Sequence, residues 1–139
     1  MFEHRCKTIV VRLRPGDDLE HSLSTITRKN DIKAGVIISL VGSLKEAHLR
    51  MAGAFQGTQL SGPLEIVSGT GTLSTNGMHV HIAVSNQLGE TIGGHLLPGC
   101  LVYTTIELVI HDLSDQWIFS REHDHETAYD ELLATPTSS

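Results

Sequence analysis

Three histidines in the middle of the chain have the spacing of a metal-ligand set. His79 and His81 are two residues apart, so in a β-strand both side chains lie on one face. If residues 86–90 form the five-residue connection of a hairpin, His95 lies directly across from His81, with the Cβ atoms about 5 Å apart. Three converging imidazoles with a fourth position open to water or another ligand are typical of a zinc site.

The register of this hairpin decides whether the site exists. A four-residue connection would send His95 to the other face, and a bulge at Gly93-Gly94 would change the parity again. Histidines at a subunit interface or in a hydrogen-bonded surface cluster are an alternative that remains open. Imidazole ligands favour zinc, although nickel, iron and copper accept the same ligands.

The strand before the histidines would add hydroxyl groups to the same face. Asn76-Gly77 is a strong signal for a two-residue hairpin turn, because both residues tolerate a positive φ. With this turn, His79 faces Ser74 and His81 faces Thr72. The candidate residues for contact with a ligand or partner, one nearby carboxylate included, are Glu65, Thr70, Thr72 and Ser74.

Catalysis would need further groups beside the histidines. Glu65 is the obvious general base in the sequence, but strict alternation places it on the face opposite to them. The chain has no serine nucleophile elbow and no phosphate-binding glycine loop. The sequence therefore assigns no catalytic residue and leaves open whether the protein is an enzyme.

The pattern of apolar residues predicts one helix among many strands. Asp17 is the expected helix cap, with Glu20 three residues later, and one apolar face follows at Leu19, Leu23 and Ile26. We expect strands at residues 8–13, 36–41, 44–51, 64–75, 78–85, 90–97, 102–111 and 116–121. Residues 52–62 are expected to form a loop, and residues 126–134 a short helix.

These elements define an α+β (α/β) fold in a single domain, residues 1–139, with a core of about residues 5–122 and a C-terminal tail of residues 123–139. Its sheet is predicted to be largely antiparallel, with seven to eight strands and one main helix. No repeat, linker or second domain is evident.

Composition narrows the functional classes. Ten Lys and Arg against sixteen Asp and Glu give a net charge of −6, which disfavours DNA binding by bulk charge. The two cysteines, Cys6 and Cys100, indicate reduced thiols rather than a disulfide framework. The N-terminus is polar, and the longest apolar stretch, residues 36–41, is too short to span a bilayer. We therefore expect a soluble cytoplasmic protein with no membrane partner.

Several motifs, in order along nearly the whole chain, resemble the plants-and-prokaryotes-conserved (PPC) domain, stand-alone prokaryotic type. The matching residues are Leu13-Arg14-Pro15-Gly16-Asp17-Asp18-Leu19, Val41-Gly42-Ser43-Leu44 with Ala47, Leu49 and Arg50, Glu65-Ile66-Val67-Ser68-Gly69-Thr70-Gly71-Thr72-Leu73, His79-Val80-His81, Gly93-Gly94-His95-Leu96 with Gly99, Thr104-Thr105-Ile106-Glu107, and Phe119, Arg121, Asp124, Thr127, Tyr129, Glu131 and Leu132.

The resemblance implies an α/β domain built on an antiparallel sheet and assembled as a homotrimer. It also implies that His79, His81 and His95 are the characteristic histidine cluster of the family. Members are usually described as DNA-binding or transcription-associated proteins, and plant members bind DNA through an AT-hook. This sequence has no Arg-Gly-Arg-Pro hook, and Gly62-Pro63-Leu64-Glu65-Ile66 replaces the Arg and Phe of the plant partner-binding motif.

The sequence thus favours a cytoplasmic homotrimer with DNA or a transcription-associated protein as its partner. Its three histidines form a potential site for zinc or another divalent transition metal. The alternative is a metal-dependent small-molecule-binding protein or a hydrolytic enzyme that uses the same site.

Overall fold

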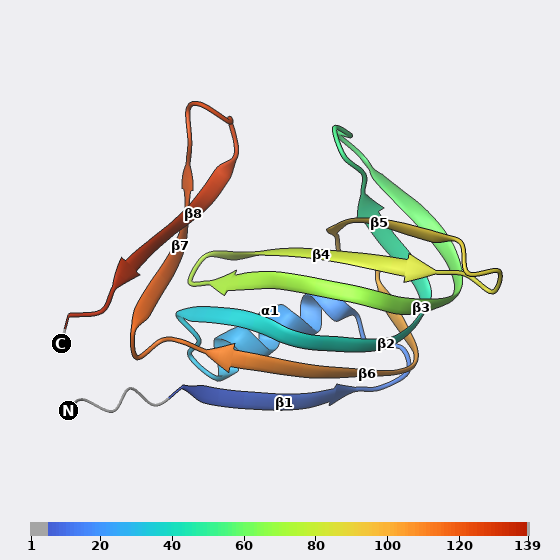
Figure 1. Cartoon of the computed structure of the whole chain (residues 1–139), viewed down its shortest axis with the longest axis horizontal. Helices are drawn as coiled ribbons and strands as arrows, with labels where there is room; N and C mark the ends of the chain where they lie inside the picture. Colours follow the sequence, from blue (N-terminus) through green and yellow to red (C-terminus); the bar gives the residue numbers. More distant parts are fainter. Residues whose placement is uncertain (1–5, 139) are drawn as a thin grey trace.

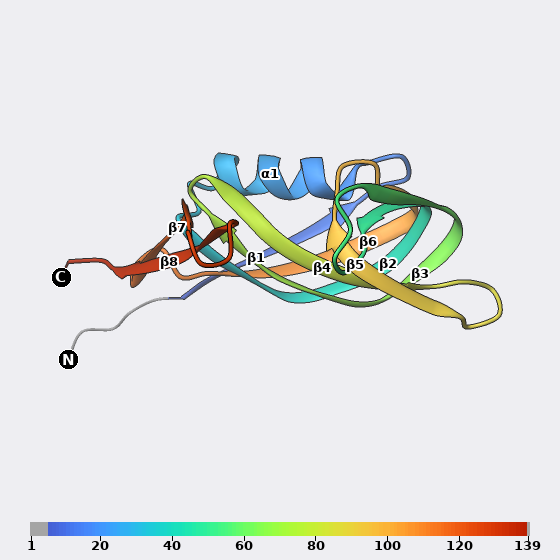
Figure 2. The same ribbon diagram turned by 90° about the horizontal axis from the view of Figure 1, so that it is seen from above.

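A twisted antiparallel sheet covered on one face by a single helix makes up most of the molecule (Figures 1 and 2). The computed structural model describes residues 6–138. The elements are β1 (Lys7–Leu13), α1 (Leu19–Lys29), β2 (Ala34–Arg50), β3 (Gly57–Ser74), β4 (Gly77–Ser85), β5 (Thr91–Leu96), β6 (Leu101–Asp112), β7 (Trp117–His123) and β8 (Asp130–Pro136).

Six strands form the main sheet in the order β1-β6-β2-β3-β4-β5, with an additional pairing between β2 and β5. Strands β7 and β8 form a separate antiparallel hairpin, which projects from the end of the sheet near the β3–β4 turn (Figure 1). The predicted architecture of one helix and a largely antiparallel sheet is confirmed. Within residues 6–138, no helix is long and apolar enough to cross a membrane.

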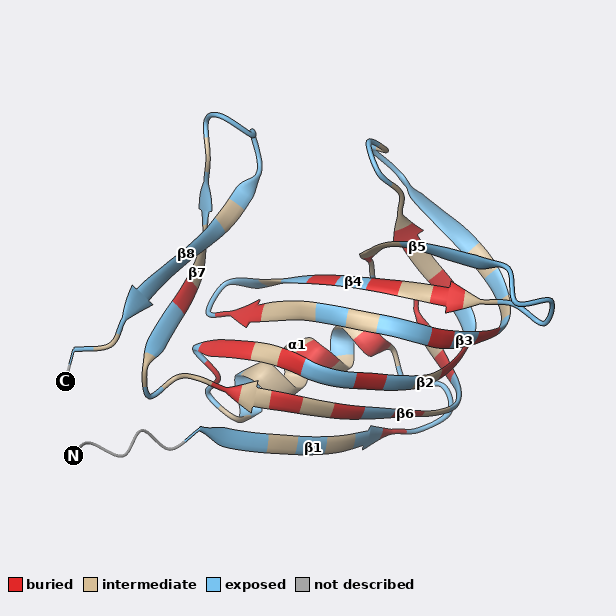
Figure 3. Cartoon of the chain, in the orientation of Figure 1, coloured by how far each residue is buried: buried red, intermediate tan, exposed pale blue. Residues whose placement is uncertain are grey.

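The core lies between α1 and the inner face of the sheet. Leu19 and Leu23 of the helix are fully buried there. Buried and exposed residues alternate along β4 and β6, as Figure 3 shows, because successive side chains of a strand point to opposite faces. The face of the sheet away from α1 has no covering element in Figure 2.

The cap of α1 differs from the sequence prediction by one residue. Asp18, in an extended conformation, accepts a hydrogen bond from the backbone N–H of His21 at 3.0 Å. Asp17 instead accepts from the backbone N–H of Arg14 and closes the turn before the helix. Asp18 also accepts from the N–H of Gly99 at 2.7 Å, so the tertiary contact with the β5–β6 turn selects Asp18 as the cap.

The two strands predicted at residues 36–41 and 44–51 are one long strand, β2, which ends at Arg50. Gly42 and Ser43 lie within this strand, where its register against β6 shifts. A Cβ on Gly42 would lie 2.1 Å from the carbonyl oxygen of Thr105, so glycine permits the close approach of β6 here. The glycine that suggested a break is therefore an irregularity inside a continuous strand.

Two predictions for the loops and the tail were wrong. Most of the expected loop at residues 52–62 is the start of β3, which begins at Gly57. The expected helix at residues 126–134 is largely β8, whose residues pair one by one with β7 from Trp117↔Pro136 to His123↔Asp130. Pairing of residues 130–136 with β7, the strand just before them in the sequence, overrides the local helical pattern of this segment.

Candidate metal centre and its pocket

The two histidines of β4 lie on the outer face of the sheet, as their spacing predicts. Val80 and Ile82, which alternate with them, are 1% and 2% exposed in the core. The facing residues differ from the prediction, because His79 pairs with Thr72 and His81 pairs with Thr70. The shift is of two residues, so the same side chains remain on the histidine face.

The shift arises because the hairpin turn is Thr75-Asn76, with Ser74 paired to Gly77. The Asn76 side chain docks on β7, where its Nδ2 donates to the carbonyl oxygen of Arg121 and its Oδ1 accepts from the N–H of Arg121. Ser74 is buried and is not one of the residues that line the pocket at the histidines.

The predicted register of β5 is confirmed, with His95 directly across from His81. Residues 86–90 form the connection, and Asn86 organises it. Its Oδ1 accepts from the backbone N–H groups of Leu88 and Glu90 at 3.0 Å each. These local hydrogen bonds fix the length of the loop, and the loop length decides on which face of the sheet His95 lies.

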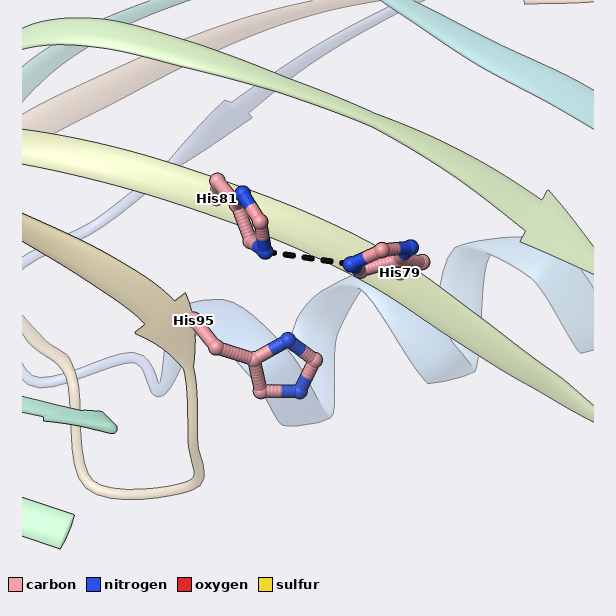
Figure 4. Close-up of side chains that lie close together, drawn as sticks. All are labelled: His79, His81 and His95. Carbon is pink, nitrogen blue, oxygen red and sulfur yellow. Dashed lines mark hydrogen bonds between the residues drawn. The ribbon is translucent and has the colours of Figure 1, made fainter. Parts of the chain in front are cut away.

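The three imidazoles converge on one point (Figure 4). One ring nitrogen of each lies within 4.8 Å of the others. The Nε2 atoms of His79 and His81 are 3.0 Å apart and share a hydrogen bond. The ring centroids are 4.7 Å apart for His79–His81, 5.5 Å for His79–His95 and 5.6 Å for His81–His95.

The electrostatic surroundings favour neutral imidazoles. Burial, followed by the charge of Arg50, lowers the pKa of His95 to about 4. Burial, followed by the neighbouring His81, lowers the pKa of His79. Neutral imidazole is the form that coordinates metals, so near neutral pH His95 and His79 present lone pairs rather than positive charges.

This donor set fits a transition-metal ion. Tetrahedral coordination with metal–nitrogen bonds of about 2.0–2.1 Å places ligand nitrogens about 3.3 Å apart. The observed separations, 3.0 Å for one pair and at most 4.8 Å for the cluster, need only small side-chain adjustments to reach it. The three histidines would fill three positions and leave the fourth facing the pocket.

Glu65 lies away from the cluster. It pairs with Ser85, four residues along β4 from His81, which is about 13 Å at the rise of a strand. A bulge between Ile66 and Ser68 reverses the alternation, so Glu65 shares the histidine face, contrary to the prediction from strict alternation. It does not line the pocket at the histidines.

A cavity of 640 Å³ opens above the three histidines. Thr70 belongs to its lining, and Thr72 lies beside it. Four further residues line it for which the sequence predicted no role there: Arg50, Arg121, Tyr129 and Glu131. All four are among the residues by which the sequence resembles the PPC domain, and that resemblance is the signal that could have identified them.

Arg121 connects the β7–β8 hairpin to the histidine face. Its Nη2 donates to the hydroxyl oxygen of Thr72 at 2.6 Å, and Thr72 is the strand partner of His79. Burial lowers the pKa of Arg121, and the charge of Glu131 opposes this effect. The arginine is thus held over the site by its backbone and its side chain.

Comparison with known proteins identifies the family. The Plants and Prokaryotes Conserved (PCC) domain, the domain abbreviated PPC above, matches residues 2–114. The chain therefore belongs to this family, which confirms the resemblance.

A bifunctional protein GlmU from Synechococcus sp. (strain JA-2-3B'a(2-13)) is 43% identical over 132 residues, 95% of this chain and 21% of the relative. The chain spans about a fifth of the length of the curated relatives it matches.

Solved structures share the whole fold. A hypothetical protein from Salmonella enterica is 38% identical with a TM-score of 0.92, covering 97% of each chain. The metal-containing protein AF0104 from Archaeoglobus fulgidus is 26% identical with a TM-score of 0.79, covering 96% of this chain and 98% of its own. A "putative DNA binding protein" from Bacteroides thetaiotaomicron, 21% identical with a TM-score of 0.81 over 93% and 96%, shares the fold.

Proposed function

We propose that the protein binds a divalent transition-metal ion, with zinc favoured, through His79, His81 and His95 and uses it to bind a small molecule. The convergence of three ring nitrogens within 4.8 Å at the base of a pocket carries this proposal. The lowered pKa of His95 and the metal-containing relative from Archaeoglobus fulgidus support it.

The proposed roles follow from the geometry. The histidines would hold the ion from the rigid β4–β5 pair, and Arg50 and Arg121 would face the molecule that enters the pocket. An ion held by three imidazoles would act as a Lewis acid at its open coordination position. Glu131 is the pocket carboxylate whose charge acts to raise the pKa of both Arg121 and His79. Glu65 lies too far away to act as a base.

Competition titration with a zinc-sensitive chromophore tests the metal site. We expect His81→Ala and His95→Ala to weaken zinc binding about a hundredfold or more while the circular dichroism spectrum stays unchanged. His21→Ala, an exposed histidine on α1, is the matched control and should bind zinc like the wild type. Unchanged zinc affinity in both site variants would contradict the proposal.

We propose further that the chain assembles as a homotrimer through the uncovered face of the sheet. Four apolar residues there are at least half exposed, and each follows a buried residue along its strand: Ile38, Val41, Val67 and Tyr103. Such a face on a small domain favours self-association. Light scattering should give three times the 15.1 kDa mass of the chain, and a monomer mass would contradict the assembly.

A second candidate function is association with DNA or with a transcription-associated protein in the cytoplasm. The name of the Bacteroides thetaiotaomicron structure suggests it, and the free thiols Cys6 and Cys100 fit a reducing compartment. The net charge of −6 favours contact through a partner over direct contact. Retention of duplex DNA at physiological ionic strength would establish direct binding, and its absence would remove that version.

A further inference from the structure

The pocket is larger than a metal site requires. Its 640 Å³ is in the range of cavities that hold small organic ligands, whereas one ion would occupy only the space at the histidines. The base of the pocket is formed by β4 and β5. Residues 50–54, at the β2–β3 turn, and residues 129–131, at the start of β8, form its other walls. Both hairpins project beyond β4 on the same side in Figure 1.

Arg121 has hydrogen-bonding capacity that the protein does not use. Asn76 fixes its backbone, and Thr72 accepts from Nη2 at 2.6 Å. Its Nε is buried and has no hydrogen-bond partner within residues 6–138. A buried donor that lacks a partner is costly, and a planar guanidinium matches a carboxylate with two parallel N–H groups. Arg121 lines the pocket and is held by Thr72 and Asn76, so its guanidinium is positioned for an anionic group, which would reach the buried Nε after a shift of the side chain.

A bound divalent ion would make the charge around the pocket favour an anion. Arg50 and Arg121 bring two positive charges, which offset the two negative charges of Asp130 and Glu131 in the same lining, and the ion would add two positive charges. Asp130 lies 3.6 Å from Nδ1 of His123, and Glu131 accepts a hydrogen bond from the hydroxyl of Thr127 at 2.9 Å.

The rest of the lining distinguishes between classes of anion. Met51 and Met78, both partly buried, provide apolar surface beside the arginines. The helix α1 contributes no residue to the lining, so no row of N-terminal amides is available to cradle a phosphate. A short carbon chain with a carboxylate fits this combination better than a phosphate does.

We propose that the pocket binds a small aliphatic carboxylate, whose carboxylate group is held by Arg121 and Arg50 beside the metal ion on the three histidines. The inference rests on the proposed metal site, because the ion would bind a second oxygen of the ligand. Ligands that carry a hydroxyl or oxo group next to the carboxylate, such as lactate or pyruvate, would meet both requirements.

Isothermal titration of the zinc-loaded protein with lactate, pyruvate, succinate and inorganic phosphate tests this. Zinc content is measured first for the wild type, Arg121→Met, Arg50→Met and the control Arg14→Met, an exposed arginine in the turn before α1. We expect equal zinc content in all four and carboxylate binding that Arg121→Met weakens about tenfold to a hundredfold. Arg121→Lys should restore part of the affinity, because lysine keeps the charge and loses the fork.

The outcomes separate the two proposals. Zinc-free wild-type protein after loading contradicts the metal site itself. Three outcomes contradict the carboxylate site alone. The zinc-loaded protein binds no carboxylate, it binds phosphate more tightly, or Arg121→Met leaves its carboxylate affinity unchanged.

Discussion

The two faces of β4 have different roles. Towards α1, Val80, Ile82 and Val84 are at most 2% exposed and pack in the core. Away from α1, His79 and His81 are exposed and meet His95 across the β4–β5 pairing. The inner face therefore stabilises the fold, and the outer face holds groups whose arrangement adds nothing evident to stability. Changes on the two faces should separate stability from binding.

The largest expected effect is on the inner face. Ile82→Ala should lower the free energy of unfolding by about 2–5 kcal/mol, because it removes buried methyl groups and leaves a cavity. Denaturant unfolding at fixed protein concentration measures this. His81→Ala in the metal-free protein is the comparison on the outer face, and an equally large loss there would break the distinction between the faces.

A smaller effect is expected where the β3–β4 hairpin meets β7. Asn76→Ala removes two hydrogen bonds to the backbone of Arg121, of 2.9 and 2.7 Å, and should cost about 1–2 kcal/mol. The same unfolding measurement on Gln87→Ala, an exposed residue of the β4–β5 loop, provides the control. Equal stability of the two variants would show that the docking of β7 on this turn is not stabilising.

A pH dependence is expected in the metal-free protein. The folded state lowers the pKa of His95 to about 4 from 6.5, so between these values the unfolded state binds a proton that the folded state does not. Stability should therefore fall as the pH falls from about 6.5 to about 4. His95→Asn should have a shallower slope over this window, and parallel curves for the two proteins would contradict the assigned surroundings of His95.

Period-two alternation and one loop length were enough to predict the histidine cluster from the sequence. His79 and His81 share a face in any regular strand, and the five-residue connection fixed His95 opposite His81. The turn lies one residue earlier than predicted, which shifts the strand register by two, and an even shift keeps every side chain on its face. Local rules sufficed because both strands of this site are neighbours in sequence.

The position of Arg121 in the pocket could not be predicted from such local rules. Arg121 reaches Thr72, 49 residues away, through a hairpin that pairs with no strand of the main sheet. Its position depends on the docking of Asn76 on β7 and on β8 being a strand, which local propensity misassigned as a helix. The bulge in β3 that reversed the face of Glu65 likewise has no clear signal in the sequence.

Metal analysis of the untagged protein, purified without a chelator, tests the central claim most directly. We predict about one zinc ion or similar divalent metal ion per chain, held by the three imidazoles. A protein that contains no metal, and still contains none after incubation with zinc and washing, would contradict the account and leave the histidines as hydrogen-bonded surface residues.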